Sequence, residues 1–255
     1  MRIATWNVNS LKVRLPHVLQ WLASHQPDAL CLQETKLEDE FFPRAEIEAA
    51  GYQVLCCGQK TYNGVAILSR TTGAEVLNEL PGFDTPQKRL IAATVNDVRV
   101  VCVYVPNGEK VTSDKYQYKL AWLAALRTWL ESELQRYPKL ALLGDFNIAP
   151  EDRDSWDPEG LRETIHHTSA ERRQFRELLE LGLTDAYRLF EQPPKSYSWW
   201  DYRMLGFQKN RGLRIDHVLV SAALKPSVTA CAIDRAPRKL AKPSDHAPVV
   251  ATLDL

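Results

Sequence analysis

Several polar side chains follow directly on apolar stretches of the chain, and Asp145 and Asn147 are the clearest case. Leu140 to Gly144 is a short apolar run that leads into these two residues, and Pro150 closes the segment. A run of this length, bounded by turn residues, predicts a buried strand. An ionised carboxylate at the edge of a core needs a cation, a donor or a reacting proton beside it. Asp145 is therefore a candidate catalytic residue.

The same arrangement recurs along the chain. Polar side chains near strand ends or beside the last strand are Asn7, Glu34, Tyr104, Asp145, Asn147, Asp245 and His246, and Asp216 lies within a predicted strand. One such residue alone is usually a cap or a turn residue, but a whole set at rigid strand ends favours a single site.

The residue types of this set predict its chemistry. Carboxylate and amide oxygens without cysteine suit a hard cation, Mg²⁺ with Mn²⁺ as a possible substitute. The chain has no GxxxxGK[ST] phosphate loop and no GxSxG nucleophile elbow. A hard cation with a nearby His and Asp favours metal-assisted attack of water on a phosphate ester.

Strands and helices must position these side chains. We predict strands over residues 2–8, 28–32, 52–57, 64–69, 91–95, 98–105, 140–144, 213–220 and 248–253. Helical spacing predicts a helix capped by Ser10, a short helix opened by Pro43, and helices over 114–136 and 170–181. Strands alternating with helices, mixed with hairpins, predict an α/β class with partly antiparallel sheets. No Ser/Gly linker divides the chain, so we expect one domain, 1–255.

Composition sets further limits. Of the 255 residues, 45% are hydrophobic and 25% charged, and 32 basic residues balance 32 acidic ones. Net charge therefore does not decide for or against an anionic partner. Residues 203–242 hold nine basic and two acidic residues, so a neutral chain can still present a basic face beside an acidic pocket. The five cysteines have no zinc-ligand or disulfide spacing, and no apolar run reaches ~18 residues. No targeting segment is evident, so we expect a soluble, cytoplasmic, monomeric protein.

Eight motifs carry a resemblance to a known family. In order they are WNVNS, LQETK, YNGVAILSR, VYVPNG, GDFNIAP, WWDYR, GLRIDHVLVS and KPSDHAP. Together they resemble the exonuclease III family of DNA-repair nucleases, the abasic-site endonuclease branch of the endonuclease/exonuclease/phosphatase superfamily. GDFN and SDHAP are specific to the superfamily, and WDYR and GLRID to the repair branch. The resemblance implies a four-layer α/β sandwich, in which two packed mixed β-sheets are flanked by helices and the site lies at one edge.

The resemblance also implies roles for the polar set. Glu34 is similar to the principal Mg²⁺ ligand, with Asn7 and Asp245 beside it. Asp145 resembles the base that activates water, and Asn147 orients the nucleophile and can share a second metal position.

The remaining implied roles concern the phosphate and the DNA. His246 would contact the scissile phosphate while Asp216 holds its imidazole, and Tyr104 would donate to a phosphate oxygen or, if ionised, repel charge there. The pocket for an extrahelical deoxyribose matches Trp199, Leu213 and Ile215. The loop that wedges into DNA matches Tyr202 and Arg203. Contacts to the DNA backbone are implied for Lys36, Lys60, Asn63, Asn107 and Lys115.

One segment departs from the family pattern. Relatives read something like GFxPEER or SFLPEER where residues 164–172 read TIHHTSAER. We hypothesise that His166 or His167 narrows the sugar pocket, which would weaken cleavage at internal abasic sites and leave 3′-end trimming intact. A solvent-exposed pair is the alternative.

These features predict a Mg²⁺-dependent repair phosphodiesterase for duplex DNA with abasic sites, nicks or blocked 3′ ends. It would combine 3′–5′ exonuclease, 3′-end-cleaning phosphodiesterase or phosphatase, and abasic-site endonuclease activities in unknown proportion, or act at 3′ ends alone. Two other hypotheses are a small-molecule or lipid phosphoesterase on the same scaffold and a binding module without catalysis. WWDYR, GLRID and the basic segment argue against the first, and the complete polar set argues against the second.

Overall fold

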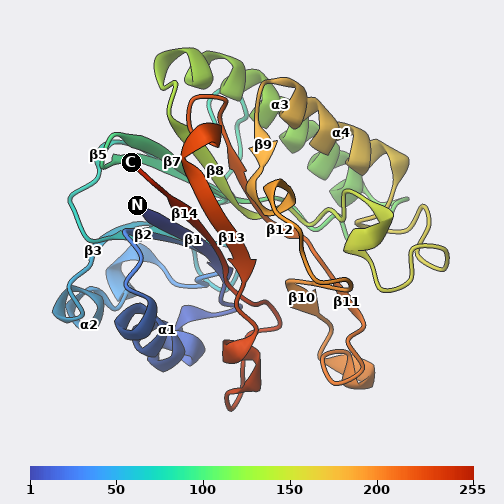
Figure 1. Ribbon diagram of the computed structural model, residues 1–255, viewed down its shortest axis with the longest axis horizontal. Coiled ribbons are helices and arrows are strands. Elements are labelled where there is room, and N and C mark those ends of the chain that lie inside the picture. The colour runs from blue at the N-terminus through green and yellow to red at the C-terminus, as the bar shows by residue number, and fades with distance from the viewer.

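Two six-stranded β-sheets form the centre of the computed structural model, which describes residues 1–255 (Figure 1). In spatial order the first sheet contains β13 (Val228–Ile233), β14 (Val249–Leu253), β1 (Arg2–Asn7), β2 (Ala29–Gln33), β4 (Val65–Ser69) and β3 (Gln53–Cys57). The second contains β5 (Ala74–Leu77), β6 (Leu90–Val95), β7 (Val98–Tyr104), β8 (Leu140–Asp145), β12 (Asp216–Val220) and β9 (Thr184–Asp185). A two-stranded ribbon joins β10 (Trp199–Trp200) to β11 (Gly212–Leu213).

Helices cover the outer face of each sheet. The α-helices are α1 (Leu11–His25), α2 (Arg44–Ala49), α3 (Asp114–Arg136) and α4 (Ser169–Glu180). Short 3₁₀ turns occupy Asp39–Phe41, Asp152–Asp154, Ala186–Leu189, Arg203–Leu205, Lys225–Ser227 and Ala236–Lys239. None of these helices has both the length and the apolar composition that crossing a membrane requires.

Three apolar cores separate the four layers. Strand residues alternate between faces, so Leu143 on β8 packs between the sheets while Leu142 packs against the helices of the second sheet. Trp6 on β1 packs under α1, where its ring lies 6.2 Å from that of Trp21. The predicted four-layer α/β sandwich with mixed sheets is confirmed.

The strand register brings polar residues to one edge. β8 lies between β7 and β12, and Asp145 pairs with Tyr104 on one side and Asp216 on the other. In the first sheet Asn7 pairs with Gln33, so Glu34 leaves β2 at the same edge. The two sheets therefore deliver their strand-end side chains to a common place.

Two sequence predictions about local structure are wrong. Residues 213–220 do not form one strand: the chain breaks between β11 and β12, and Asp216 begins β12 instead of lying inside a strand. The Ser198 hydroxyl accepts hydrogen bonds from the backbone N–H groups of Ile215 and Asp216 at this break. Ser10 stands at the start of α1, but its side chain makes no capping bond and its φ of 88° lies in the left-handed region.

Candidate active site

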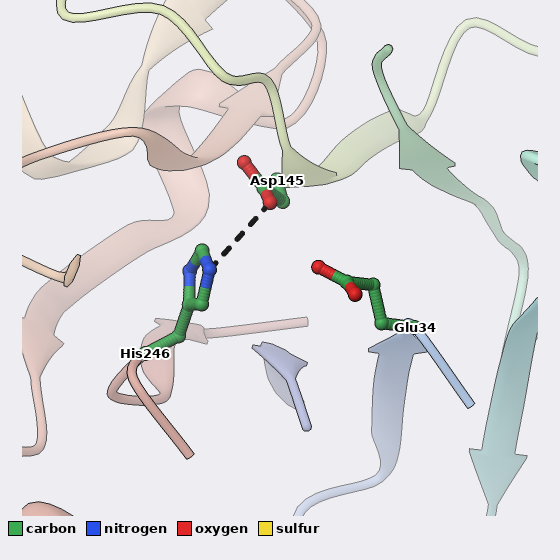
Figure 2. Close-up of side chains that lie close together, drawn as sticks. All are labelled: Glu34, Asp145 and His246. Carbon is green, nitrogen blue, oxygen red and sulfur yellow. Dashed lines mark ion pairs between the residues drawn. The ribbon is translucent and has the colours of Figure 1, made fainter. Parts of the chain in front are cut away.

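Three side chains from different segments converge where the two sheets meet. Potential ligand atoms of Glu34, Asp145 and His246 all lie within 4.8 Å of one another (Figure 2). Asp145 ends β8, Glu34 follows β2, and His246 precedes β14. Two carboxylates and one imidazole in this arrangement can hold a divalent cation and a phosphate between them.

Asn7 joins the two carboxylates. Its Nδ2 donates to Glu34 Oε1 at 2.8 Å and to Asp145 Oδ2 at 2.9 Å, and its Oδ1 accepts from the backbone N–H of Asn9 at 3.0 Å. Asn7 thus ties the end of β1 to the carboxylates of both sheets. A role as a metal ligand would require the Asn7 amide to turn its oxygen toward the carboxylates of Glu34 and Asp145. That role stays a prediction.

His246 forms a pair with Asp216. Its Nδ1 lies 2.9 Å from Asp216 Oδ2, which leaves Nε2 facing Asp145 Oδ2 at 3.7 Å. Burial alone would lower the pKa of His246, but the carboxylates of Asp216 and Asp145 outweigh it and raise the pKa to about 10. Without a metal, the imidazole is therefore a buried cation between two acids.

Asp145 has an unusual carboxyl pKa. Burial raises this pKa to about 7, with a further rise from Asp216 and an opposing effect of His246. Its oxygens accept hydrogen bonds from Asn7 Nδ2 and from the backbone N–H of Asn147 at 2.9 Å. A carboxyl group poised near neutral pH suits exchange of a proton with water.

Tyr104 and Asn147 border this centre. Burial, followed by the charges of Glu34 and Asp145, raises the pKa of Tyr104 well above its usual value. The phenol is therefore a neutral donor, and the ionised alternative is disfavoured. Asn147 Nδ2 donates to the carbonyl oxygen of Val105 at 3.0 Å, which fixes the side chain next to Asp145.

Asp245 lies at the edge of the cluster. Its two oxygens accept hydrogen bonds from Asn9 Nδ2 and from Trp199 Nε1, both at 3.0 Å. It is not among the side chains whose atoms converge within 4.8 Å. Its predicted role as a metal ligand stays a prediction.

Comparison with known proteins places this centre in a family. Residues 4–246 match the endonuclease/exonuclease/phosphatase family, a span that runs from β1 to His246. The chain belongs to this family.

Individual relatives agree over the full length. Exodeoxyribonuclease III of Haemophilus influenzae is 35% identical over 98% of this chain and 99% of its own. A Neisseria 3′ phosphatase (NExo), solved bound to a product DNA hairpin, is 50% identical with a TM-score of 0.98, and an AP endonuclease from Archaeoglobus fulgidus is 38% identical with a TM-score of 0.96. Both solved chains are covered completely, as is this one. The resemblance to the exonuclease III branch is confirmed.

The histidine pair of this family member is buried, so the solvent-exposed alternative is wrong. His166 Nδ1 lies 2.6 Å from the carbonyl oxygen of Asn147, and its ring centroid lies 6.4 Å from that of Trp199. His167 turns its Nε2 to Ser155 Oγ at 3.0 Å. Of the two, His166 therefore stands beside the predicted sugar pocket.

The other predicted DNA-contacting residues line several clefts and contact other residues of the protein. Leu213 and Ile215 are buried together beneath a partly exposed Trp199. Arg203 pairs with Asp201 at 3.0 Å. Two lysines form ion pairs, Lys36 with Glu34 at 2.9 Å and Lys115 with Glu109 at 2.5 Å. Asn107 Nδ2 donates to Asn147 Oδ1 at 3.1 Å, and the Tyr202 hydroxyl donates to the carbonyl of Pro243 at 2.8 Å. Lys60 and Asn63 line neighbouring clefts.

Sequence reasoning missed a buried ion pair behind the site. Lys119 Nζ donates to Glu171 Oε1 at 2.5 Å and to the carbonyl of Asn147 at 2.7 Å, and Glu171 also accepts the backbone N–H of His166. The pair thus ties Asn147 and the His166 loop to α3 and α4. Spacing could have revealed it, because Lys119 stands three residues before Trp122 on the buried face of its helix.

Proposed function

We propose that this protein is a Mg²⁺-dependent phosphodiesterase that processes 3′ ends in duplex DNA by attack of water on phosphorus. The observation that carries the proposal is the convergence of Glu34, Asp145 and His246 within 4.8 Å, with Asp216 behind the imidazole. Titratable groups whose pKa values are shifted by burial and by specific charge partners are concentrated at functional sites.

The donor set fits a hard divalent cation. Glu34 and Asp145 supply carboxylate oxygens, Asn7 contacts both of them, and Asn147 and Asp245 are the further ligands that we propose. No cysteine lies in the set, which favours Mg²⁺, with Mn²⁺ as a substitute. The bound ion would neutralise phosphate charge and stabilise the departing oxygen.

The side chains of the site have distinct parts in the reaction. Asp145 takes the proton from the attacking water, and Asn147 orients that water. Protonated His246, held by Asp216, donates to a non-bridging phosphate oxygen. The neutral phenol of Tyr104 donates to a second oxygen.

The preference for 3′ ends rests on His166. Its ring is fixed by the hydrogen bond to the Asn147 carbonyl and stands beside Trp199, where an extrahelical deoxyribose would have to enter. A 3′ phosphate carries no sugar beyond phosphorus and does not need that space, and a terminal nucleotide has no downstream strand, so it is free to turn its sugar away from His166. The 50% identical Neisseria 3′ phosphatase supports this choice over an abasic-site endonuclease.

The remaining parts of the proposal concern the domain organisation, the location in the cell and the DNA. Residues 1–255 act as one catalytic domain, since both sheets supply site residues, and nothing in the site requires a second chain. We place the protein in the cytoplasm, where its five free cysteines stay reduced. Duplex DNA with nicks or blocked 3′ ends lies across the site, with Lys36, Lys60, Asn63, Asn107, Lys115, Tyr202 and Arg203 near its backbone.

The test compares end-labelled duplexes in Mg²⁺ with an EDTA control. One duplex carries an internal abasic site and its pair a recessed 3′ end with or without a phosphate. We expect cleavage only at 3′ ends, and none in EDTA. Strong incision at the abasic site would overturn the 3′-end preference, and no hydrolysis of either duplex would return the small-molecule phosphoesterase hypothesis to favour.

A variant tests the cause of the preference. His166 has a φ of 73°, which glycine adopts without strain, so His166→Gly opens space without distorting the loop. We expect abasic-site incision to rise roughly 10-fold or more, because the sugar can then reach a productive position. His167→Gln, which faces Ser155, is the matched control. Unchanged abasic-site incision in His166→Gly would rule out His166 as the barrier.

A further inference from the structure

A cleft of about 600 Å³ opens beside the catalytic centre, and the chemistry above uses only its inner end. Trp199, Leu213 and His166 line that inner end, near His246. The rest of the lining includes Trp156, Leu161, Ile165 and Arg211, which we call the outer cleft. No role has been assigned to these four residues so far.

Backbone pairing connects the outer cleft rigidly to the reacting centre. His246 bridges to Trp199, Trp199 pairs with Leu213, and Leu213 bridges to Ser155, the residue before Trp156. Three inter-strand spacings of about 4.8 Å place the two ends of this row about 14 Å apart. Trp156 is anchored further, since its backbone N–H donates to the carbonyl of Gly212 at 3.1 Å.

The outer cleft presents a flat, cationic surface. The Arg211 guanidinium lies over the Trp156 ring, 4.9 Å from its centroid, and the indole is 38% exposed. Arg211 forms no ion pair, whereas Arg203 on the same cleft is paired with Asp201. Aromatic rings and guanidinium planes are the surfaces on which unpaired bases stack, and a free cation attracts their phosphates.

We propose that the outer cleft binds the unpaired 3′-terminal nucleotide that the exonuclease reaction removes. This rests on the proposed function, because it assumes that the centre hydrolyses DNA at 3′ ends. His166 narrows the inner end of the cleft beside Trp199, so the base of a frayed terminal nucleotide extends past it onto Trp156 and Arg211. Leu161 and Ile165 form the apolar wall of the cleft.

The two 3′-end reactions use this cleft differently. In both, the water oxygen bonds to phosphorus, the water proton passes to Asp145, and the bond from phosphorus to the 3′ oxygen of the upstream strand breaks, that oxygen taking a proton from solvent. With a terminal nucleotide, the leaving group on phosphorus is the upstream strand and the nucleotide remains attached to the phosphate. With a 3′ phosphate, nothing lies beyond phosphorus, so the outer cleft stays unused.

The test measures kcat/KM on one duplex bearing either an unpaired 3′-terminal nucleotide or a 3′ phosphate. For Trp156→Ala we expect the ratio of exonuclease to phosphatase kcat/KM to fall about 10-fold, the typical effect of losing one base–aromatic stack. Trp156→Phe keeps a stacking ring and should retain a ratio within about 2-fold of wild type. Arg211→Ala, on the exposed side of the cleft, should lower the ratio about 3-fold.

Because the ratio is internal to each variant, a general loss of folded protein does not change it. An unchanged ratio in both Trp156→Ala and Arg211→Ala would overturn the proposal that the outer cleft binds the terminal nucleotide. The wild-type rates would still support the proposed function. A wild-type protein inactive at both 3′ ends would overturn the proposed function itself.

Discussion

Two buried histidines, His246 and His217, lie near the start of β12 in opposite electrostatic surroundings. His246 faces Asp216 and Asp145, and its pKa rises to about 10. His217 follows Asp216 on the strand and so points to the other face of the sheet, where it packs against Phe175 with ring centroids 4.8 Å apart. Burial and the adjacent Arg214 lower the pKa of His217 to about 3.

Each histidine belongs to a different kind of polar cluster. His217 Nδ1 accepts from the Arg214 guanidinium at 3.0 Å and its Nε2 donates to the carbonyl of Ile148 at 3.0 Å, so the ring is fixed as one neutral tautomer. Arg214 in turn is held by Asp154 at 2.6 Å and Asp185 at 2.8 Å. In this cluster every charge has its partner at hydrogen-bonding distance, whereas His246 Nε2 in the Glu34–Asp145–His246 cluster lies 3.7 Å from Asp145 Oδ2. Burial alone therefore does not set the charge of a buried histidine; the sign of the neighbouring charge decides it.

The largest expected effect is on the catalytic side. Asp145→Asn should lower kcat for 3′-end hydrolysis about 10³- to 10⁴-fold, because an amide cannot take the proton from water. The free energy of unfolding should fall by about 1–3 kcal/mol, since the amide keeps the size of the side chain but has one acceptor oxygen, where Asp145 accepts from both the Asn147 N–H and Asn7 Nδ2. Gel-based kinetics and urea unfolding measure the two quantities. Near wild-type turnover would remove Asp145 from the mechanism.

Asp154→Asn should give the opposite pattern. It leaves Arg214 and Arg188 without one carboxylate in a buried cluster, and breaking such a pair costs about 3–5 kcal/mol of stability. Hydrolysis of a 3′ phosphate by the folded fraction should stay within about 3-fold of wild type. Urea unfolding and rates measured below the unfolding transition provide the comparison. A large rate loss without destabilisation would mean that the two clusters are not functionally separate.

The catalytic cluster was predictable from the sequence, while the structural one was not. Asp145, Glu34 and His246 each stand at the boundary of an apolar strand run, and strand ends of a packed sheet meet at an edge. Asp154 sits in a polar loop and finds Arg214, 60 residues away, only through the tertiary fold. Nothing local distinguishes Asp154 from the solvated acids beside it.

The fold shows the same division. The apolar runs of β1, β2, β7 and β8 and the long α3 were predicted because their patterns are complete within each segment. Edge strands β5 and β13 were missed, since their exposed residues dilute the alternation. The break before Asp216 was missed because Arg214, buried by its partners, reads as part of a continuous strand.

A smaller effect on kcat should distinguish His246 from His217. His246→Asn should lower kcat about 10²-fold, because the phosphate loses one preorganised donor. Steady-state kinetics at saturating DNA measures this change in kcat separately from any change in DNA binding. His217→Asn is the matched substitution on the opposite face and should leave kcat within about 3-fold. Equal losses in the two variants would break the distinction drawn between them.

His217 also contributes a pH dependence to the stability of the protein. Its pKa in the folded protein, about 3, lies below the ordinary value of 6.5, so the unfolded chain binds the proton more readily. The stabilisation is therefore fully present above about pH 6.5 and is lost as the pH falls toward 3, on the order of a few kcal/mol in all. His217→Gln keeps one donor and one acceptor but cannot titrate, so its free energy of unfolding should fall less steeply between pH 6.5 and 4 than that of the wild type. Urea unfolding across this range measures both slopes, and the common contribution of other groups cancels in their difference. Identical slopes would show that His217 accepts a proton in the folded protein, and the contrast with His246 would then not rest on the charge of Arg214.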